Sequence, residues 1–344
     1  MAPPTFAEAT AIVAKDSHTY EVVNFPPEWC IGSVPHGGVV TSALLRVAAL
    51  HFATTLSSAR QPHTIIAHVE FLRRTQAGRA LVSVRDVKVG RQTSTVHLSL
   101  SQGGDDLVVA YVTNGTDLSL GSGDGGVSLE TGWALHPPPA APAPADFARL
   151  AARGGDAHWA ELRDRPFAEF RGAMGRLRMF VPRGARAGPA RRSHVVEEWV
   201  RFASGERFTN ESVGFVSDAW PQLLEGWGAD PPAAVEGGKG EKGEKEKEQR
   251  QEDGKAVRER QRKAWHWYPT LVLNLDVKKA LPPEGVEWLF VRLHAKQVKN
   301  GRLDYEIVIM DQAGDIVALS HHVVMVVDGE RNLAKRRGTG ESKI

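Results

Sequence analysis

The sequence predicts an α+β fold built from two copies of one unit, in which a long antiparallel sheet wraps around a buried helix. Two observations predict this fold. The helix expected over 38–56 is small and apolar almost all round, with only Arg46 and His51 to face water, so the chain must enclose it or it must span a membrane. Strand-like segments follow it, and the same order of segments recurs, which places the units at 17–118 and 175–328.

The composition of the 344 residues favours a helix that is enclosed within a globular protein. Apolar residues make up 42% and charged residues 24% of the chain, enough for a sizeable core. No apolar run reaches about 18 residues without a polar interruption, so no membrane span is expected. The net charge of +2, with both signs interspersed, argues against a nucleic-acid partner. The lone cysteine, Cys30, excludes an intrachain disulfide and fits a reducing compartment.

Residues 65–112 carry the strands of the first unit. Apolar residues recur with the period of a strand that buries one face, at Val82, Val84, Val87, Val89, Val96, Leu98 and Leu100. A Gly-Arg turn at 90–91 separates the two runs, and the glycine pair in QGGDD at 102–106 supplies a tight hairpin turn. The helix and these strands together form one unit.

Residues 271–320 repeat this order of strands and turns. The alternation runs through Tyr305, Ile307 and Ile309, and DQAGD at 311–315 supplies the last turn. A second helix is expected over 211–227, where Asp218 takes the place that Ala43 has in the first helix. Two such sheets can join edge to edge, with both helices on the same side of the larger sheet.

Three segments are predicted to lie outside the hydrophobic core. Residues 119–174 combine a proline- and alanine-rich linker with short connecting helices. The charged, low-complexity stretch within 232–263 is expected to be a disordered insertion in the second unit. Residues 329–344 form a basic polar tail whose last three residues, Ser342-Lys343-Ile344, are one conservative step from the peroxisomal address Ser-Lys-Leu. A peroxisomal location is therefore expected, with a cytoplasmic one as the alternative.

Several segments in both halves resemble the double-hotdog acyl-CoA thioesterases of the thioesterase II type, and more closely the thioesterase-like proteins of fungi. The segments that carry the resemblance are PHGGVV (35–40), HVEFLRR (68–74), VGRQTST (89–95), VSDAWP (216–221), LNLDVKKALPPEGVEWLFVRL (273–293) and GDIVALSHHVVMVVD (314–328). The resemblance implies two hotdog repeats fused in one chain, each a sheet wrapped around one helix, in agreement with the pattern of strands and helices.

The resemblance also implies a set of catalytic residues. In that family the catalytic water is held by an aspartate on the second helix, a threonine on the following strand and a glutamine near the end of the last strand. The matching positions here are Asp218, Asn274 and His322. An asparagine can orient a water molecule through hydrogen bonds, and a histidine can orient it or act as a base.

The start of the first helix supplies candidate substrate contacts. Gly37 and Gly38 lack side chains, so a ligand or another backbone can approach them closely, or they form only a tight turn into the helix. Unpaired N–H groups at a helix N-terminus can hold an anion or a developing oxyanion. His36 and His68 are assigned to the same substrate-binding group, although each is also a candidate for a structural histidine.

The leading functional hypothesis is an acyl-CoA thioesterase that hydrolyses fatty acyl-CoA to free fatty acid and CoA through a water activated by Asp218. Two alternatives remain open: an enoyl-thioester hydratase that uses Asp218 with His322, and a non-catalytic acyl-CoA-binding protein. No phosphate loop, dinucleotide fingerprint or zinc-ligand spacing is present in the sequence, so neither a cofactor nor a metal is expected. Acyl-CoA is the expected partner, and a homodimer is compatible with the sequence.

Overall fold

The computed structural model describes residues 3–116, 129, 131–140, 145–163, 165, 167–183, 194–220 and 266–334. The first unit follows the predicted order of strand, helix and further strands. Its main elements are β1 (Ile12–Ala14), β2 (Thr19–Phe25), α2 (Gly37–Thr54), β5 (His63–Phe71), β6 (Gly78–Lys88), β7 (Thr93–Gln102) and β8 (Asp105–Gly115). Its short elements are α1 (Phe6–Ala9), η1 (Pro27–Trp29), β3 (Cys30–Ile31), β4 (Val34–Pro35) and η2 (Ser57–Ala59).

The second unit repeats this order. Its main elements are β10 (Leu177–Pro182), β11 (Val195–Phe202), α4 (Val213–Val216), β13 (Thr270–Val277), β14 (Leu289–Lys299), β15 (Arg302–Met310) and β16 (Ile316–Met325). Short elements precede or follow them: α3 (Phe147–Arg153), β9 (Trp159–Glu161), η3 (Gly172–Arg176), β12 (His266–Trp267), β17 (Val327–Asp328) and α7 (Glu330–Leu333).

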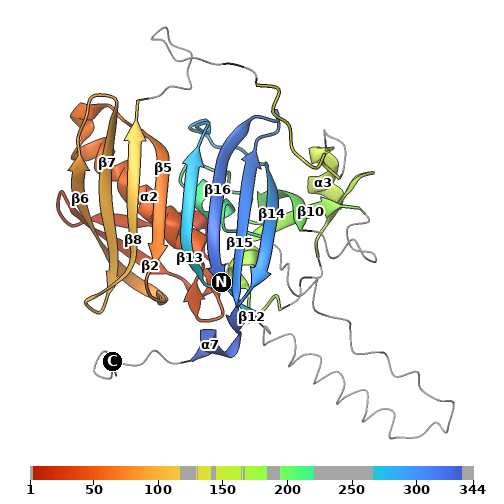
Figure 1. The fold of residues 1–344 in the computed structure, drawn as a ribbon, viewed down its shortest axis with the longest axis horizontal. Coiled ribbons are helices and arrows are strands. Elements are labelled where there is room, and N and C mark those ends of the chain that lie inside the picture. Colours follow the sequence, from red (N-terminus) through yellow and green to blue (C-terminus); the bar gives the residue numbers. More distant parts are fainter. Residues whose placement is uncertain are drawn as a thin grey trace, which may run out of the picture.

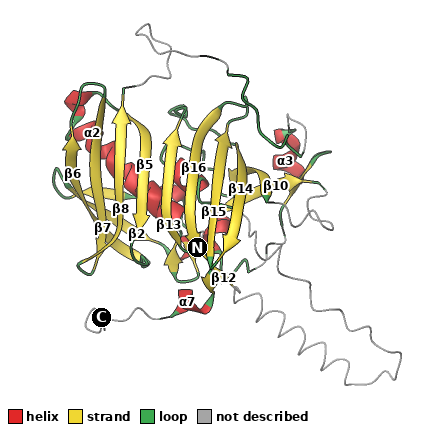
Figure 2. Ribbon diagram, in the orientation of Figure 1, coloured by secondary structure: helices red, strands yellow, loops and turns green. Residues whose placement is uncertain are grey.

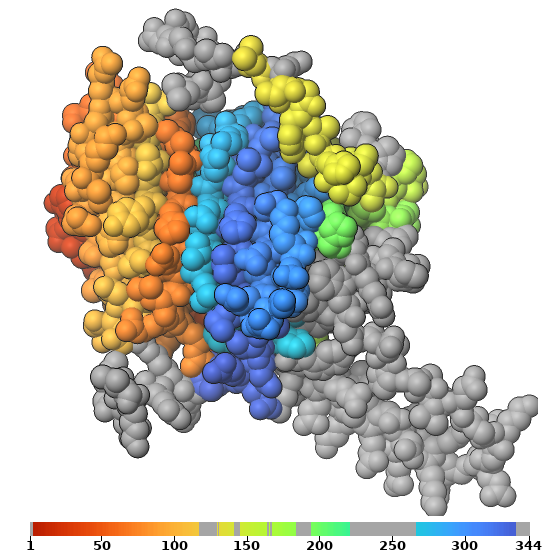
Figure 3. All heavy atoms as spheres, in the orientation of Figure 1, coloured from red at the N-terminus to blue at the C-terminus, as the bar shows by residue number. Residues whose placement is uncertain are grey.

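One antiparallel sheet of 13 strands passes through both units, in the order β1-β2-β6-β7-β8-β5-β13-β16-β15-β14-β11-β10-β9 (Figures 1 and 2). The two halves join where β5 pairs with β13, with Val69 opposite Leu273 and His68 opposite Asn274. Figure 3 shows these two strands, orange and cyan, side by side in the middle of the outer face of the sheet. The predicted edge-to-edge union of the two repeats is therefore confirmed.

Helix α2 lies against the inner face of this sheet (Figure 2), as the apolar sequence predicted. By length and composition alone α2 could cross a membrane, but 67% of it is buried inside the protein, as in a core helix. Of the two residues expected to face water, His51 is instead fully buried. Its imidazole must therefore have polar partners inside the protein.

The second helix is shorter than predicted within the described residues. Helix α4 makes one turn, and Ser217 and Asp218 follow it in a turn of the chain. The remainder of the helix predicted over 211–227 lies, from 221 onward, outside the described residues, as does the insertion predicted to be disordered at 232–263. Asp218 is therefore placed at the end of a short helix, beside the start of α2.

Two other local predictions differ from the structure. The segment between the repeats contains a strand as well as the predicted helix: β9 pairs with β10 and forms one edge of the sheet. Val87 and Val89, predicted to alternate with the buried valines of β6, are 44% and 57% exposed. A register shift between Asp86 and Lys88 in the β6–β7 ladder interrupts the alternation, and a pattern of apolar residues cannot reveal such a bulge.

The two glycines that begin α2 are required by the approach of the second repeat. A Cβ atom at Gly38 would lie 2.8 Å from the carbonyl oxygen of Gly214 and 2.9 Å from Cα of Phe215, both in α4. A Cβ atom at Gly37 would lie 2.7 Å from Oδ2 of Asp218. The backbone of α4 therefore excludes a side chain at Gly38, and the Asp218 side chain takes the space that a side chain at Gly37 would need.

We predict that Gly38→Ala lowers the free energy of unfolding by about 1–3 kcal/mol, because the added methyl group has no space and the two helices must move apart. Urea unfolding followed by circular dichroism measures this change. Gly175→Ala is the control, since a Cβ atom there meets nothing within 4 Å. Its effect should stay within about 0.5 kcal/mol. Equal stability of Gly38→Ala and the wild-type protein would contradict the packing described here.

Candidate active site

The Asp218 carboxylate is held by the helix of the other repeat. The backbone N–H of Gly38 donates a hydrogen bond of 2.8 Å to Oδ2 of Asp218. Gly38 lies in the first turn of α2, where the amides have no partner within the helix and carry partial positive charge. The anion that this helix N-terminus holds in the structure is therefore a side chain of the second repeat.

Two hydroxyl groups approach the other carboxylate oxygen. Oγ1 of Thr270, the first residue of β13, lies 3.4 Å from Oδ1 of Asp218, and so does the hydroxyl oxygen of Tyr305 in β15. Burial and the charge of Asp218 raise the pKa of Tyr305 well above 10, so this hydroxyl keeps its hydrogen. Gly38 and Thr270, one from each repeat, thus donate to the two carboxylate oxygens of Asp218, and the Tyr305 hydroxyl lies beside the second oxygen.

Burial raises the pKa of Asp218 to about 7, against the lowering effect of the hydrogen bond from Gly38. The side chain is 7% exposed, so water stabilises its charged form only weakly. A carboxylate with a pKa near neutrality can accept a proton from water and give it up again, which suits a general acid–base group.

His36 caps the N-terminus of α2 and is electrically neutral. Its Nδ1 atom accepts a 3.1 Å hydrogen bond from the Gly38 amide and lies 3.6 Å from Oδ2 of Asp218. Burial, together with the charge of Arg171, lowers the pKa of His36 to about 3. Two acceptors, His36 and Asp218, therefore share the amide of Gly38, and His36 adds no positive charge to the site.

His322 is buried behind Asp218 and is also neutral. Burial is the main reason that its pKa falls to about 3. The hydroxyl of Ser320 donates to the carbonyl of Asn274 at 2.7 Å, so Nε2 of His322 must donate to the Ser320 oxygen, 2.8 Å away. Nδ1, 3.0 Å from the Tyr305 hydroxyl, is then the acceptor. His322 consequently fixes Tyr305, and its Nδ1 lies 3.7 Å from Asp218.

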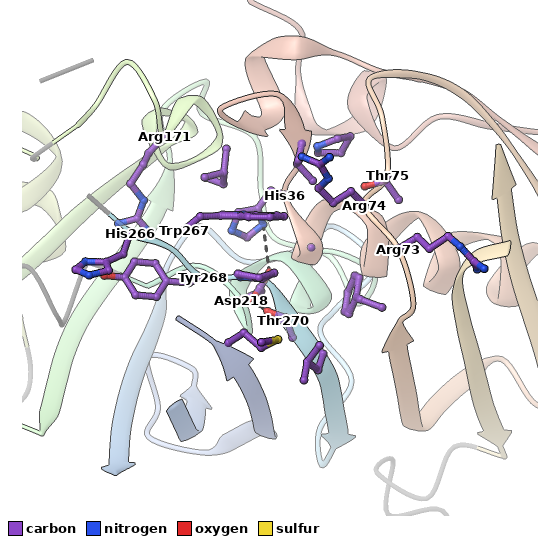
Figure 4. Close-up of a pocket in the computed structure, with 18 of the residues that line it drawn as sticks. His36, Arg73, Arg74, Thr75, Arg171, Asp218, His266, Trp267, Tyr268 and Thr270 are labelled. Carbon is purple, nitrogen blue, oxygen red and sulfur yellow. Dashed lines mark hydrogen bonds and ion pairs between the residues drawn. The ribbon is translucent and has the colours of Figure 1, made fainter. Parts of the chain in front are cut away.

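A pocket of about 300 Å³ opens beside Asp218 (Figure 4). Both repeats and the segment between them line it, with apolar and aromatic side chains in the majority. Three arginines, Arg73, Arg74 and Arg171, are the cationic members of the lining. Asp218, His36, Gly37 and Thr270 belong to the same lining, so the carboxylate and the start of α2 face one space. Such a pocket suits a largely apolar ligand that also carries negative charge.

The C-terminal segment fastens one wall of this pocket. Asn332 in α7 is fully buried and accepts a hydrogen bond of 2.9 Å from the amide of Ser33. The side-chain Nδ2 of Asn332 donates to the carbonyl of Ile31 at 2.8 Å. The backbone carbonyl of Asn332 accepts from the Ser33 hydroxyl at 2.7 Å. These bonds fix the β3–β4 hairpin that leads into His36, so α7 helps to position the start of α2.

The structure brings most, but not all, of the predicted site residues together. Asp218, His36, Gly37, Gly38 and His322 lie next to one another, as described above. Asn274 and His68 do not join them. They face each other across the β5–β13 junction, where Nδ1 of His68 donates to Oδ1 of Asn274 at 2.6 Å.

Asn274 points to the outer face of the sheet because its neighbours in β13 point inward. Leu273 and Leu275 are buried in the core, and alternate residues of a strand face opposite sides. Thr270, which the sequence analysis missed, is the polar residue of β13 that lies beside Asp218, the position that the sequence analysis assigned to Asn274. A register shift between Thr270 and Val272 turns it toward Asp218. Its residue type was the only available signal, since a bulge cannot be read from the alternation.

Within the described ranges, only the group formed by His18, His51 and Asp86 has the composition and closeness to hold a metal ion. His51 lies 13 residues beyond Gly38 along α2, which corresponds to about 20 Å. This group is therefore separate from the Asp218 pocket.

The chain is similar to thioesterases in both sequence and structure. Residues 25–115 match the model for the acyl-CoA thioesterase N-terminal domain, and residues 137–326 match that for the C-terminal domain. The thioesterase-like protein TwmA of Talaromyces wortmannii is 37% identical over 356 residues, which cover 98% of this chain and 97% of TwmA.

Two crystal structures show the same double-hotdog fold. A putative thioesterase II from Thermobifida fusca has a TM-score of 0.65 at 20% identity, covering 95% of this chain and 99% of that one. The acyl-CoA thioesterase II TesB2 of Mycobacterium marinum has a TM-score of 0.53 at 14% identity, covering 94% and 98%. The predicted double-hotdog architecture is therefore confirmed.

We predict that Asn332→Ala lowers the free energy of unfolding by about 1–3 kcal/mol, because the Ser33 amide and the Ile31 carbonyl lose their partner. Chemical unfolding monitored by tryptophan fluorescence measures the change. The neighbouring Leu333→Ala is the control, since Leu333 is 50% exposed, and it should be close to neutral. If the two variants are equally stable, the hydrogen bonds of Asn332 do not hold the hairpin.

Proposed function

Because the chain belongs to the acyl-CoA thioesterase family, we propose that it hydrolyses fatty acyl-CoA to a free fatty acid and CoA, with Asp218 activating the attacking water. The observation that carries this proposal is the buried Asp218 carboxylate, whose pKa lies near 7, at the wall of a pocket beside a helix N-terminus. Thioester hydrolysis needs a base for water and donors for the oxyanion, and this arrangement offers both.

Asp218 acts first as a base and then as an acid. It takes a proton from water as the water oxygen bonds to the thioester carbonyl carbon. When the C–S bond breaks, the protonated carboxyl returns that proton to the CoA thiolate, and the acid product loses its own proton to solvent. A pKa of about 7 makes both transfers accessible at neutral pH.

Gly37 supplies the donor for the oxyanion. Gly38 already uses its amide to hold Asp218, whereas the amide of Gly37, at the first position of α2, has no acceptor among the residues that the structure describes. Gly37 lines the pocket, so a thioester carbonyl can reach its N–H group. The two glycines thus have different tasks: one orients the base and the other stabilises negative charge on the substrate.

Thr270 takes the water-positioning role that the sequence analysis gave to Asn274. Its hydroxyl lies 3.4 Å from Oδ1 of Asp218 and faces the pocket, whereas Asn274 lies on the opposite face of the sheet. His322 acts through Tyr305 as a positioning residue, because both of its ring nitrogens are engaged and its side chain is fully buried. The same burial disfavours the hydratase alternative, in which a histidine must reach the substrate.

Thiol release from a panel of acyl-CoA chain lengths tests this proposal. We predict that Asp218→Asn lowers turnover roughly 10²-fold or more. Its stability should hold or rise, since a buried charge is removed. Thr270→Ala should lower turnover about tenfold, which corresponds to an activation free energy higher by ~1.4 kcal/mol. Asn274→Ala is the matched control on the same strand and should retain wild-type turnover.

The same assay should show a rate that depends on the ionised form of Asp218. Below pH 7, kcat/KM should fall about tenfold for each unit of pH, and above pH 7 it should level off.

Equal rates for Asp218→Asn and the wild-type protein would remove Asp218 from the mechanism. Acyl-CoA binding without thiol release would favour the non-catalytic alternative, and loss of enoyl-CoA absorbance without thiol release would favour the hydratase.

We further propose a peroxisomal location. The support is the sequence Ser342-Lys343-Ile344, which lies outside the described residues. A fluorescent protein fused to the N-terminus should appear in puncta that contain a peroxisomal marker, and removal of Ile344 should make the signal diffuse. A signal that is equally diffuse in both forms would contradict this location and favour the cytoplasm.

A further inference from the structure

Three polar residues from distant parts of the first repeat meet beyond the far end of the Asp218 site. His51 belongs to the last turns of α2, Asp86 lies on β6, and His18 lies in the turn between β1 and β2. Nε2 of His51 lies 2.8 Å from Oδ1 of Asp86, and Nε2 of His18 lies 3.4 Å from Oδ2 of the same carboxylate. One ligand atom from each residue lies within 4.8 Å of the other two.

We propose that His18, His51 and Asp86 form a binding site for a divalent transition-metal ion, Zn²⁺ in the first place. Two imidazoles and one carboxylate are a ligand set that zinc uses in proteins, with water in the fourth position. The sequence shows no zinc motif because the ligands are far apart: Asp86 is 35 positions from His51 and 68 from His18.

The separations of the ligand atoms fit such an ion. Zinc bonds of about 2.0–2.2 Å at tetrahedral angles place ligand atoms about 3.3 Å apart. The histidine nitrogens lie at separations close to this value from the two oxygens of Asp86, 2.8 Å for His51 to Oδ1 and 3.4 Å for His18 to Oδ2. The three ligand atoms lie within 4.8 Å of one another, so rotation of the side chains would have to bring them closer together around one ion.

The second nitrogen of each imidazole has a hydroxyl partner, and a metal-bound histidine likewise has a hydrogen-bond partner at the nitrogen that does not bind the metal. Nδ1 of His18 lies 2.9 Å from Oγ of Ser17, and Nδ1 of His51 lies 3.0 Å from the hydroxyl of Tyr20. The Tyr20 hydroxyl can donate to the carbonyl of Ser17 at 3.3 Å and then accept from Nδ1 of His51. Both rings are thereby oriented with Nε2 toward Asp86.

A metal ion could take the place of the hydrogens that join the two rings to the carboxylate. Without an ion, Nε2 of His51 donates its hydrogen to Oδ1 of Asp86 at 2.8 Å when the Tyr20 hydroxyl donates to Nδ1 at 3.0 Å. A proton satisfies one such contact, whereas a metal ion satisfies His51 and His18 together. The side chains of His18 and Asp86 are 44% and 29% exposed, so an ion can enter from solvent.

Bound zinc would fasten the end of α2 to the β1–β2 turn and β6, which a hydrogen bond of 2.8 Å from the Val84 amide to the His18 carbonyl already joins to each other. The β1–β2 turn, the end of α2 and β6 each contribute one ligand. The site is about 20 Å along α2 from Asp218, so its occupancy can be tested independently of the proposed hydrolysis.

Zinc titration of the full-length, tag-free protein, stripped with a chelator beforehand, tests this site. With a chromophoric chelator as competitor, we expect one Zn²⁺ per chain with a dissociation constant in the micromolar range or below. His18→Ala and Asp86→Asn should each weaken binding by more than the roughly 10- to 100-fold typical of losing a second-shell partner. Tyr20→Phe, which removes only the hydroxyl behind His51, should fall within that smaller range, and His97→Ala should bind as the wild-type protein does.

Cobalt binding provides a second measurement that needs no variant. Co²⁺ added to the stripped wild-type protein should give the intense visible absorption of a four-coordinate site, and one equivalent of Zn²⁺ should remove it. No binding of either metal by the wild-type protein would overturn the proposal. Binding that is equally strong in His18→Ala and Asp86→Asn would also overturn it, because the metal would then lie elsewhere on the surface.

Discussion

The hydrogen bond from the Gly38 amide to the Asp218 carboxylate is the contact on which the arrangement of the site depends. It can form only because α2 of the first repeat and α4 of the second approach each other without side chains at Gly37 and Gly38. That approach follows in turn from the β5–β13 junction, which makes one sheet of the two repeats and places both helices on its inner face. The proposed base therefore belongs to one repeat and its anchor to the other.

Burial and the helix N-terminus have opposite effects on this carboxylate. Burial destabilises the charged form of Asp218, and the amide of Gly38 stabilises it, with a resulting pKa of about 7. The two histidines nearest to Asp218 add no positive charge, because burial lowers the pKa of both His36 and His322 to about 3. Their roles are to orient a backbone amide and a tyrosine hydroxyl, which keeps the carboxylate basic enough to accept a proton near neutral pH.

Residues from both repeats and from the segment between them line the pocket. Phe170 and Arg171, which lie between the repeats, line it together with residues of both hotdog units. Asn332, near the end of the described chain, fixes the hairpin that precedes His36. The segment that the sequence suggested to be a connector therefore contributes both an edge strand and part of the pocket wall.

The sequence by itself determined the two repeats, most of their strands, the burial of α2 and the prominence of Asp218, because periodicity and an isolated charge on an apolar helix are local signals. It could not determine which face of β13 each polar residue occupies: the shift at Thr270 brings that residue to Asp218, whereas Asn274 points outward to His68. It also could not show that His51 is buried beside Asp86 and His18. A bulge reverses the facing of a strand without changing its composition, and contacts between residues far apart in the chain exist only once the sheet has closed around the helix. The tertiary structure alone therefore decided which polar side chains share a site.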